Sequence, residues 1–120
     1  METDDKIEQN IQPSEVYVSD IPELKKIFLK IFRVKSVDEN FGIPFLLMKK
    51  GNDISAFASL IINENKIDFT IYENPDIPIK EKEKFNEIAK KYYKRSNSAN
   101  FRNADHLKNR IIRMIDWLNV

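Results

Sequence analysis

The side chains best suited to chemistry in this chain are cations near its C-terminus, interleaved with aromatic rings. Residues 90–95 read Lys-Lys-Tyr-Tyr-Lys-Arg, and Phe101 follows. Lys and Arg bind phosphate oxygens, and rings such as Tyr93 and Phe101 can stack on bases. The segment 90–113 is therefore a candidate anion or nucleic-acid contact. Its cations are Lys90, Lys91, Lys94, Arg95, Arg102, Lys108, Arg110 and Arg113.

The alternative interpretation is that these cations form a solvated helix face and that Tyr92 and Phe101 belong to the core. Residues 80–120 hold 11 Lys or Arg against 5 Asp or Glu, whereas residues 1–79 hold 9 against 14. The net charge is only +1, so the two halves can attract each other rather than a nucleic acid. The sequence also carries no known nucleic-acid motif. Both points favour the solvated face.

No residues are spaced for catalysis or for holding a metal. His106 is the only histidine, and no second ligand lies at a recognisable metal-site spacing from it. The acidic pairs Asp4-Asp5 and Asp38-Glu39 fall in a tail and a connector. The chain has no cysteine, which excludes thiolate sites and fits a reducing compartment. We therefore predict no catalytic, cofactor-binding or metal-binding residue.

Length and composition predict one cytoplasmic domain. The chain has 120 residues, of which 42% are hydrophobic and 32% charged, and these values are typical of a single globular domain. Residues 1–5 are acidic and lack the apolar segment of a secretory signal. The longest apolar run, residues 56–62, is too short to span a bilayer. We expect residues 1–14 to form a disordered tail and residues 15–120 to form the domain.

Hydrophobic spacing predicts the elements that would position these residues. Residues 15–19 alternate as a strand, and Asp20 and Glu23 have the spacing of a capping box. Residues 24–32 then repeat apolar side chains at helical spacing. A meander of strands follows, at residues 45–49, 54–63 and 66–72, with its first turn at residues 50–53. The middle strand is apolar on both faces, so it should be covered on both sides.

Two helices complete the pattern. The first follows Pro78 and carries the apolar stripe Phe85, Ile88, Ala89 and Tyr92. A small, polar loop is expected at residues 95–100, and a second helix at residues 104–118, capped by Asn103. The order β-α-β-β-β-α-α predicts an α+β fold with helices packed on an antiparallel sheet.

About half of the chain, residues 15–74, resembles the opening of the GCN5-related N-acetyltransferases. Residues 16–24, Val-Tyr-Val-Ser-Asp-Ile-Pro-Glu-Leu, are similar to that family's first strand and the start of its first helix. Residues 45–58 are similar to its second and third strands with a charged hairpin between them, and residues 67–72 would be the fourth strand. The resemblance implies a truncated version of the acyl-CoA N-acyltransferase fold.

The chain departs from that family where the fourth strand ends. Members carry a glycine-rich loop there, whose backbone N–H groups approach the pyrophosphate of acetyl-CoA at a helix N-terminus. In this chain residues 74–79 contain no glycine, and Pro75 and Pro78 remove two backbone donors. Asp76 adds a negative charge. No cofactor or catalytic residue is therefore carried over from the resemblance.

We therefore expect a protein that acts by contact with other proteins rather than by catalysis. Ile112 and Trp117 fall off the main apolar stripe of the last helix, which predicts an interface for a homodimer or another protein. Two alternatives remain. One is a divergent acetyl-CoA-dependent N-acyltransferase, and the other is a nucleic-acid-binding protein that uses the segment 90–113. No membrane contact is expected.

Overall fold

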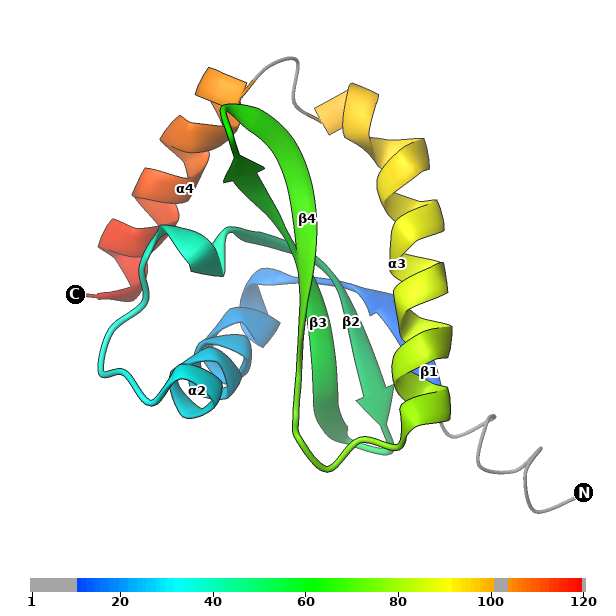
Figure 1. Cartoon of the computed structure of the whole chain (residues 1–120). Coiled ribbons are helices and arrows are strands. Elements are labelled where there is room, and N and C mark those ends of the chain that lie inside the picture. The colour runs from blue at the N-terminus through cyan, green and yellow to red at the C-terminus, as the bar shows by residue number, and fades with distance from the viewer. Residues whose placement is uncertain (1–10, 101–103, 120) are drawn as a thin grey trace, which may run out of the picture.

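The computed structural model of the chain describes residues 11–100 and 104–119. It is an α+β fold in which an antiparallel four-stranded sheet lies between helices (Figure 1). The strands are arranged in the order β1-β2-β3-β4. The elements are β1 (Ile11–Glu15), η1 (Val18–Asp20), α2 (Ile21–Phe32), η2 (Glu39–Phe41), β2 (Ile43–Lys50), β3 (Asp53–Asn63), β4 (Lys66–Glu73), α3 (Ile79–Asn100) and α4 (Ala104–Leu118).

The predicted meander is confirmed in β2, β3 and β4. Lys50 pairs with Asp53 across the first turn, where Gly51 has a φ of 66°. Glu64 and Asn65 form the second turn with φ values of 52° and 64°. Two consecutive residues of positive φ are what the tightest hairpins require, because this twist matches that of the flanking strands. Local turn chemistry therefore sets the register of β3 and β4, whereas the pairing of β2 with β3 shifts between Pro44 and Leu46 and between Met48 and Lys49.

The predicted strand at residues 15–19 is wrong, because the first strand is β1 at residues 11–15, paired with β2. The carboxylate of Asp20 accepts the backbone N–H of Tyr17 at 2.9 Å, and the Asp20 N–H donates to the Tyr17 carbonyl at 2.9 Å. These bonds fold residues 18–20 into a 3₁₀ turn, since a short polar side chain competes with the ladder for backbone groups. The Asp20 side chain makes no cap bond to α2, so the predicted capping box is also wrong.

The expected tail is wrong for residues 11–14, which lie in β1. Pro13 has no backbone N–H to donate to a neighbouring strand, and a polar segment that contains proline is typical of a loop. An outer strand nevertheless tolerates a proline, because one side of it needs no donor. Residues 1–10 lie outside the described part of the chain.

Helix α2 covers one face of the sheet. Its residues Leu24, Ile27 and Phe28 are buried, as their spacing predicts. They join a core that includes Phe57 of β3 and Tyr72 of β4. The ring of Phe28 meets that of Tyr72 edge-on at 5.4 Å, a favoured aromatic geometry.

Helix α3 covers the opposite face. Phe85 and Ala89 are buried against residues of β2 and β3 that include Met48 and Ala58. The two faces of β3 are thus both covered, which agrees with its doubly apolar sequence. The loop expected at residues 95–100 is wrong, because α3 continues to Asn100. Polar side chains do not end a helix unless a proline or a left-handed cap does so.

Helix α4 has the predicted bounds and joins two parts of the core. Leu107 and Ile111 pack with Leu60 of β3, and Leu118 joins the cluster of α2. At its C-terminal end, Lys25 of α2 donates a hydrogen bond to the Leu118 carbonyl. The predicted cap, Asn103, lies outside the described residues. Of the described helices, none is long and apolar enough to cross a membrane.

The two glycines offer a matched test of backbone constraint. Gly42 has φ 65° and ψ −151°, a region open only to glycine, and a Cβ there would lie 2.1 Å from the Leu60 carbonyl oxygen. Gly51 has a similar φ, but its Cβ would meet nothing within 4 Å. Gly51→Ala should cost about 1 kcal/mol of unfolding free energy, and Gly42→Ala at least ~2 kcal/mol more. Urea denaturation of both variants checks this, and equal losses would contradict the described backbone.

Candidate functional site

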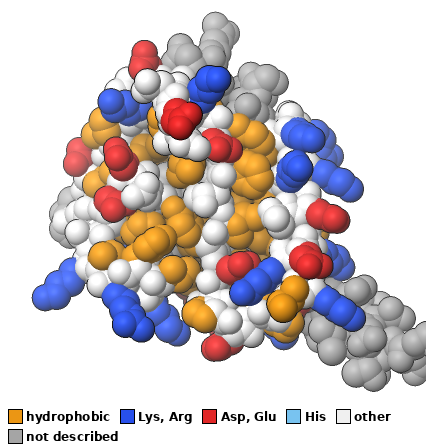
Figure 2. All heavy atoms as spheres, viewed as in Figure 1, with side chains coloured by type: hydrophobic (Ala, Val, Ile, Leu, Met, Phe, Trp, Pro, Cys, Tyr) orange, Lys and Arg blue, Asp and Glu red, His pale blue; other side chains and the backbone are white. Residues whose placement is uncertain are grey.

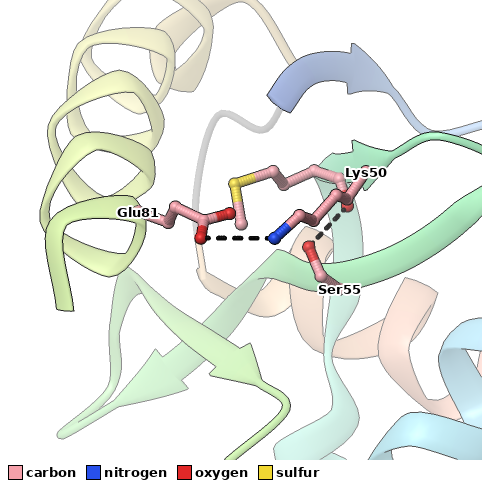
Figure 3. Close-up of polar contacts among 4 residues, drawn as sticks. Lys50, Ser55 and Glu81 are labelled. Atoms are coloured by element: carbon pink, nitrogen blue, oxygen red, sulfur yellow. Dashed lines mark hydrogen bonds and ion pairs between the residues drawn. The ribbon is translucent and has the colours of Figure 1, made fainter. Parts of the chain in front are cut away.

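The point where β4 ends holds an internal ion pair at the N-terminus of α3. Glu81, in the first turn of α3, is 5% exposed, and its carboxylate lies 3.7 Å from the Lys50 ammonium at the end of β2. Figure 3 shows the two side chains pointing toward each other from α3 and β2. A carboxylate in the first turn interacts favourably with the positive end of the helix dipole. The first turn of α3 thus already carries a negative charge of the chain itself.

Strand β4 is an outer strand of the sheet, with a regular pattern of exposed backbone groups. The Asn74 N–H donates to the Ser55 carbonyl at 3.0 Å, and β4 stays in register with β3 along its length. The direction of the backbone N–H and C=O groups alternates along a strand. In β4, these groups point toward β3 at even-numbered residues and away from the sheet at odd-numbered residues. The residues whose backbone groups point away from the sheet are Ile67, Phe69, Ile71 and Glu73.

The N-terminal half of this edge is blocked from within. The Tyr93 hydroxyl of α3 donates to the Ile67 carbonyl at 2.9 Å, and the Asp68 carboxylate accepts the Phe69 N–H at 2.8 Å. Burial, and then the charge of Asp68, raise the pKa of Tyr93, so the hydroxyl stays a donor at neutral pH. Side chains that occupy edge groups are a common protection against unwanted strand pairing.

The C-terminal half of the edge is open and has apolar surface on both sides. A groove of about 300 Å³ runs between β4 and α3, lined by Phe69 and Ile71 and bordered by the Glu73–Lys82 ion pair at 3.9 Å. Beyond the opposite face of β4 lies Phe32 of α2, 48% exposed. In Figure 2 a white strip of backbone and polar side chains along β4 runs between two orange apolar bands.

The other outer strand is poorly suited to pairing. Strand β1 has only five residues, and Pro13 lacks a backbone donor. The Tyr92 hydroxyl of α3 donates to the Glu15 carboxylate at 2.8 Å, which ties this strand to the helix. The β1 edge is therefore unsuited to strand pairing because it is short and contains a proline. The β4 edge remains open at residues 70–73.

A second hollow, of about 710 Å³, lies along α4 beside the β3–β4 turn. Ile62 of β3 and three isoleucines of α4 line it, and the carboxylates of Glu39, Glu64 and Asp105 stand around it. This hollow contains Ile112, which is 47% exposed, but not Trp117, which is 51% exposed. The exposure expected for both side chains is present, but they do not form one surface, because five residues turn a helix by roughly 140°.

The predicted cations lie on two different helices. Lys90, Lys91, Lys94 and Arg95 are exposed on α3, whereas Lys108, Arg110 and Arg113 are exposed on α4. Figure 1 places these helices on opposite sides of β4. Arg102 and Phe101 lie outside the described residues.

Tyr93, one of the rings expected to stack on a base, packs in the core instead. Tyr93 is half-buried, its ring lies 4.8 Å from that of Phe69, and its hydroxyl is bonded to the Ile67 carbonyl. It cannot stack on a base without leaving these contacts. In the described part of the chain, no three His, Cys, Asp or Glu side chains are placed to hold a metal ion.

The open edge and the hollow along α4 were not found from sequence. The signal for the edge was present, because residues 66–73 alternate, contain no proline and end a meander before a helix. The hollow depends on how α4 meets η2 and the β3–β4 turn, which no local pattern reveals. No protein-family model, curated protein or solved structure matches the chain.

The Lys50–Glu81 pair should stabilise the start of α3. Lys50→Met leaves a buried carboxylate without its cation and should lower the unfolding free energy by about 1 kcal/mol, since Lys50 is half exposed. Adding Glu81→Gln should recover part of that loss because the unpaired charge is gone. Urea denaturation of the single and double variants checks this. Lys84→Met, an exposed site on α3, is the control and should be neutral.

The hydroxyl of Tyr72 should make the fold sensitive to alkali. Burial, and then the charge of Asp38, raise its pKa from 10.0 to about 12, and the hydroxyl donates to the Asn40 carbonyl. Between these values the unfolded chain releases a proton that the folded protein keeps, so stability present below pH 10 is lost as pH rises toward 12. The unfolding free energy of Tyr72→Phe should fall less over this range than that of the wild type. Parallel declines would contradict the assignment.

Proposed function

We propose that this chain is a non-catalytic protein-interaction module that binds through the open half of β4. The observation that carries the proposal is the outward-facing backbone of residues 69–73, which has apolar surface on both sides. An unpaired strand edge binds an added strand through main-chain hydrogen bonds, while neighbouring pockets select its side chains. The negative charge of Glu81 in the first turn of α3 supports a function other than binding a pyrophosphate, because it would repel that anion.

The partner that fits this edge is a second copy of the chain. A two-fold axis at Ile71 places Ile71 opposite itself and Phe69 opposite Glu73 of the other copy. The open groups, which are the Phe69 carbonyl, both groups of Ile71 and the Glu73 N–H, then pair in four hydrogen bonds. The two blocked groups, the Ile67 carbonyl and the Phe69 N–H, take no part in them. The edge is thus complementary to itself in one register.

The layers beside the sheet can continue across such a contact. Phe32 lies 5.6 Å from the ring of Tyr72 and is 48% exposed. On the α3 side, the groove beside Ile71 has room for one aliphatic side chain. Burial of apolar surface in both layers would stabilise the pairing beyond its hydrogen bonds.

The resemblance to acetyltransferases remains a proposal about ancestry. It is supported by the helix between the first two strands and by antiparallel strands in chain order. It is weakened at residues 16–24, since residues 18–20 form a turn rather than a strand. Activity toward acetyl-CoA gains no support, because the first turn of α3 follows a segment without glycine and carries the negative charge of Glu81.

Proline at position 71 is the sharpest test of the β4 edge. Ile71→Pro removes an outward N–H without removing a bond to β3, so the domain should stay folded while self-association is lost. Multi-angle light scattering should give twice the monomer mass of 14.2 kDa for the wild type at high concentration, and the monomer mass for the variant. Ile71→Ala, which shortens the side chain but keeps the N–H, should still associate.

Hydrogen exchange supplies the second measurement. The N–H groups of Ile71 and Glu73 should exchange more slowly as protein concentration rises, whereas the already bonded N–H of Phe69 should change little. A wild type that stays monomeric at every concentration would refute the pairing of two copies. Equal association of wild type and Ile71→Pro would place the interface elsewhere.

A further inference from the structure

The hollow along α4 has the form of a groove. Its α4 wall is formed by residues 104, 105, 108, 111, 112 and 115, which lie on one face of the helix over three turns. At 1.5 Å per residue, this wall is about 16 Å long. The facing walls come from η2 and the β3–β4 turn, so three separate elements enclose an elongated space of about 710 Å³. Such a shape suits an elongated ligand.

The floor of the groove is apolar. Ile62 of β3 and Ile111, Ile112 and Ile115 of α4 line it. Ile112 is 47% exposed because it lies off the buried stripe of α4, which contains Leu107, Ile111 and Leu118. A ligand that covers these side chains would gain the free energy of removing apolar surface from water.

The rim of the groove is acidic. Glu39 of η2, Glu64 of the β3–β4 turn and Asp105 of α4 are all exposed around it, against the single cation Lys108. The ion pairs found among the described residues, Lys50–Glu81 and Lys82–Glu73, do not involve them. Three carboxylates from three elements thus surround an apolar floor, and this arrangement attracts a cationic ligand.

We propose that this groove binds a basic amphipathic helix of another protein. A helix of about three turns matches the length of the α4 wall. Its apolar face would cover Ile112 and its neighbours, and lysine or arginine at its borders would meet the carboxylates of the rim. Helix-in-groove binding of this kind uses apolar anchors at helical spacing. Nucleic acid and anionic membranes are repelled by the same rim.

A second copy of this chain does not fit the groove. Its most basic helix is α3, and Phe85 and Ala89 of the α3 apolar stripe are already buried against the sheet. Among the described side chains of α3, the exposed face combines its cations with one large, strongly exposed apolar residue, Ile79, at the first position of the helix, and so lacks apolar anchors spaced over three turns. The groove is thus a site for a different protein, and it is separate from the β4 edge.

The test uses a fluorescein-labelled synthetic peptide with leucine and lysine at amphipathic helical spacing, and fluorescence anisotropy as the readout. The full chain should bind it, whereas the same peptide with glutamate in place of lysine should not bind. Ile112→Ser should weaken binding about tenfold, which corresponds to ~1.4 kcal/mol. Trp117→Ser is the matched control, since it changes an equally exposed α4 side chain outside the groove.

The charges of the rim are tested by a triple variant, Glu39→Gln, Glu64→Gln and Asp105→Asn. It should weaken binding and flatten its dependence on salt, whereas Asp116→Asn, an exposed carboxylate of α4 outside the groove, should do neither. Ile71→Pro should leave peptide binding unchanged, which separates this site from the β4 edge.

Three outcomes would overturn the proposal. The first is equal binding of the lysine and glutamate peptides, or of neither. The second is equal weakening by Ile112→Ser and Trp117→Ser, which would mean general adhesion to α4. The third is loss of self-association in Ile112→Ser, because it would place a second copy in the groove.

Discussion

The structure depends on the fact that strand β3 is apolar on both faces. Ala56 and Ala58 face α3, and Phe57 between them faces α2, so neither layer of helices can be omitted without exposing core. The two alanines are fully buried against the α3 cluster, and the ring of Phe57 is fully buried in the α2 cluster. With both faces covered, only the edges of the sheet are left for contact with other molecules. The candidate site follows from this constraint.

Much of the fold could be predicted because its signals are local. The turns at Gly51 and at Glu64-Asn65 are encoded within a few residues, and the apolar spacing of α2 and α4 repeats along each helix. The N-terminal strand could not be placed in the same way. Val16 and Val18 alternate as a strand does, yet the bonds between Asp20 and Tyr17 curl the chain directly after β1 has ended. A single side-chain hydrogen bond outweighs a weak alternation.

The candidate site was less predictable because it depends on tertiary contacts. The sequence placed the cations of residues 90–113 in one segment, but the structure distributes them over two helices, α3 and α4, which flank β4 (Figure 1). It also marked Ile112 and Trp117 as exposed, which they are, but the groove beside Ile112 arises only where α4 meets η2 and the β3–β4 turn. The commitment of the Tyr93 hydroxyl to the Ile67 carbonyl is equally non-local. The sequence therefore indicated which side chains could bind a partner, whereas the tertiary packing determines which of them lie together and which are already bonded within the domain.

The proline in β1 has a consequence for the size of any assembly. A sheet that could pair at both outer strands would add copies without limit and grow into a fibre. Pro13 interrupts one outer strand, while Tyr93 and Asp68 shorten the usable part of the other. In the proposed pairing, growth by strand addition would stop once two β4 edges have met. Pro13 would therefore limit the proposed assembly to two copies and oppose amyloid-like polymerisation.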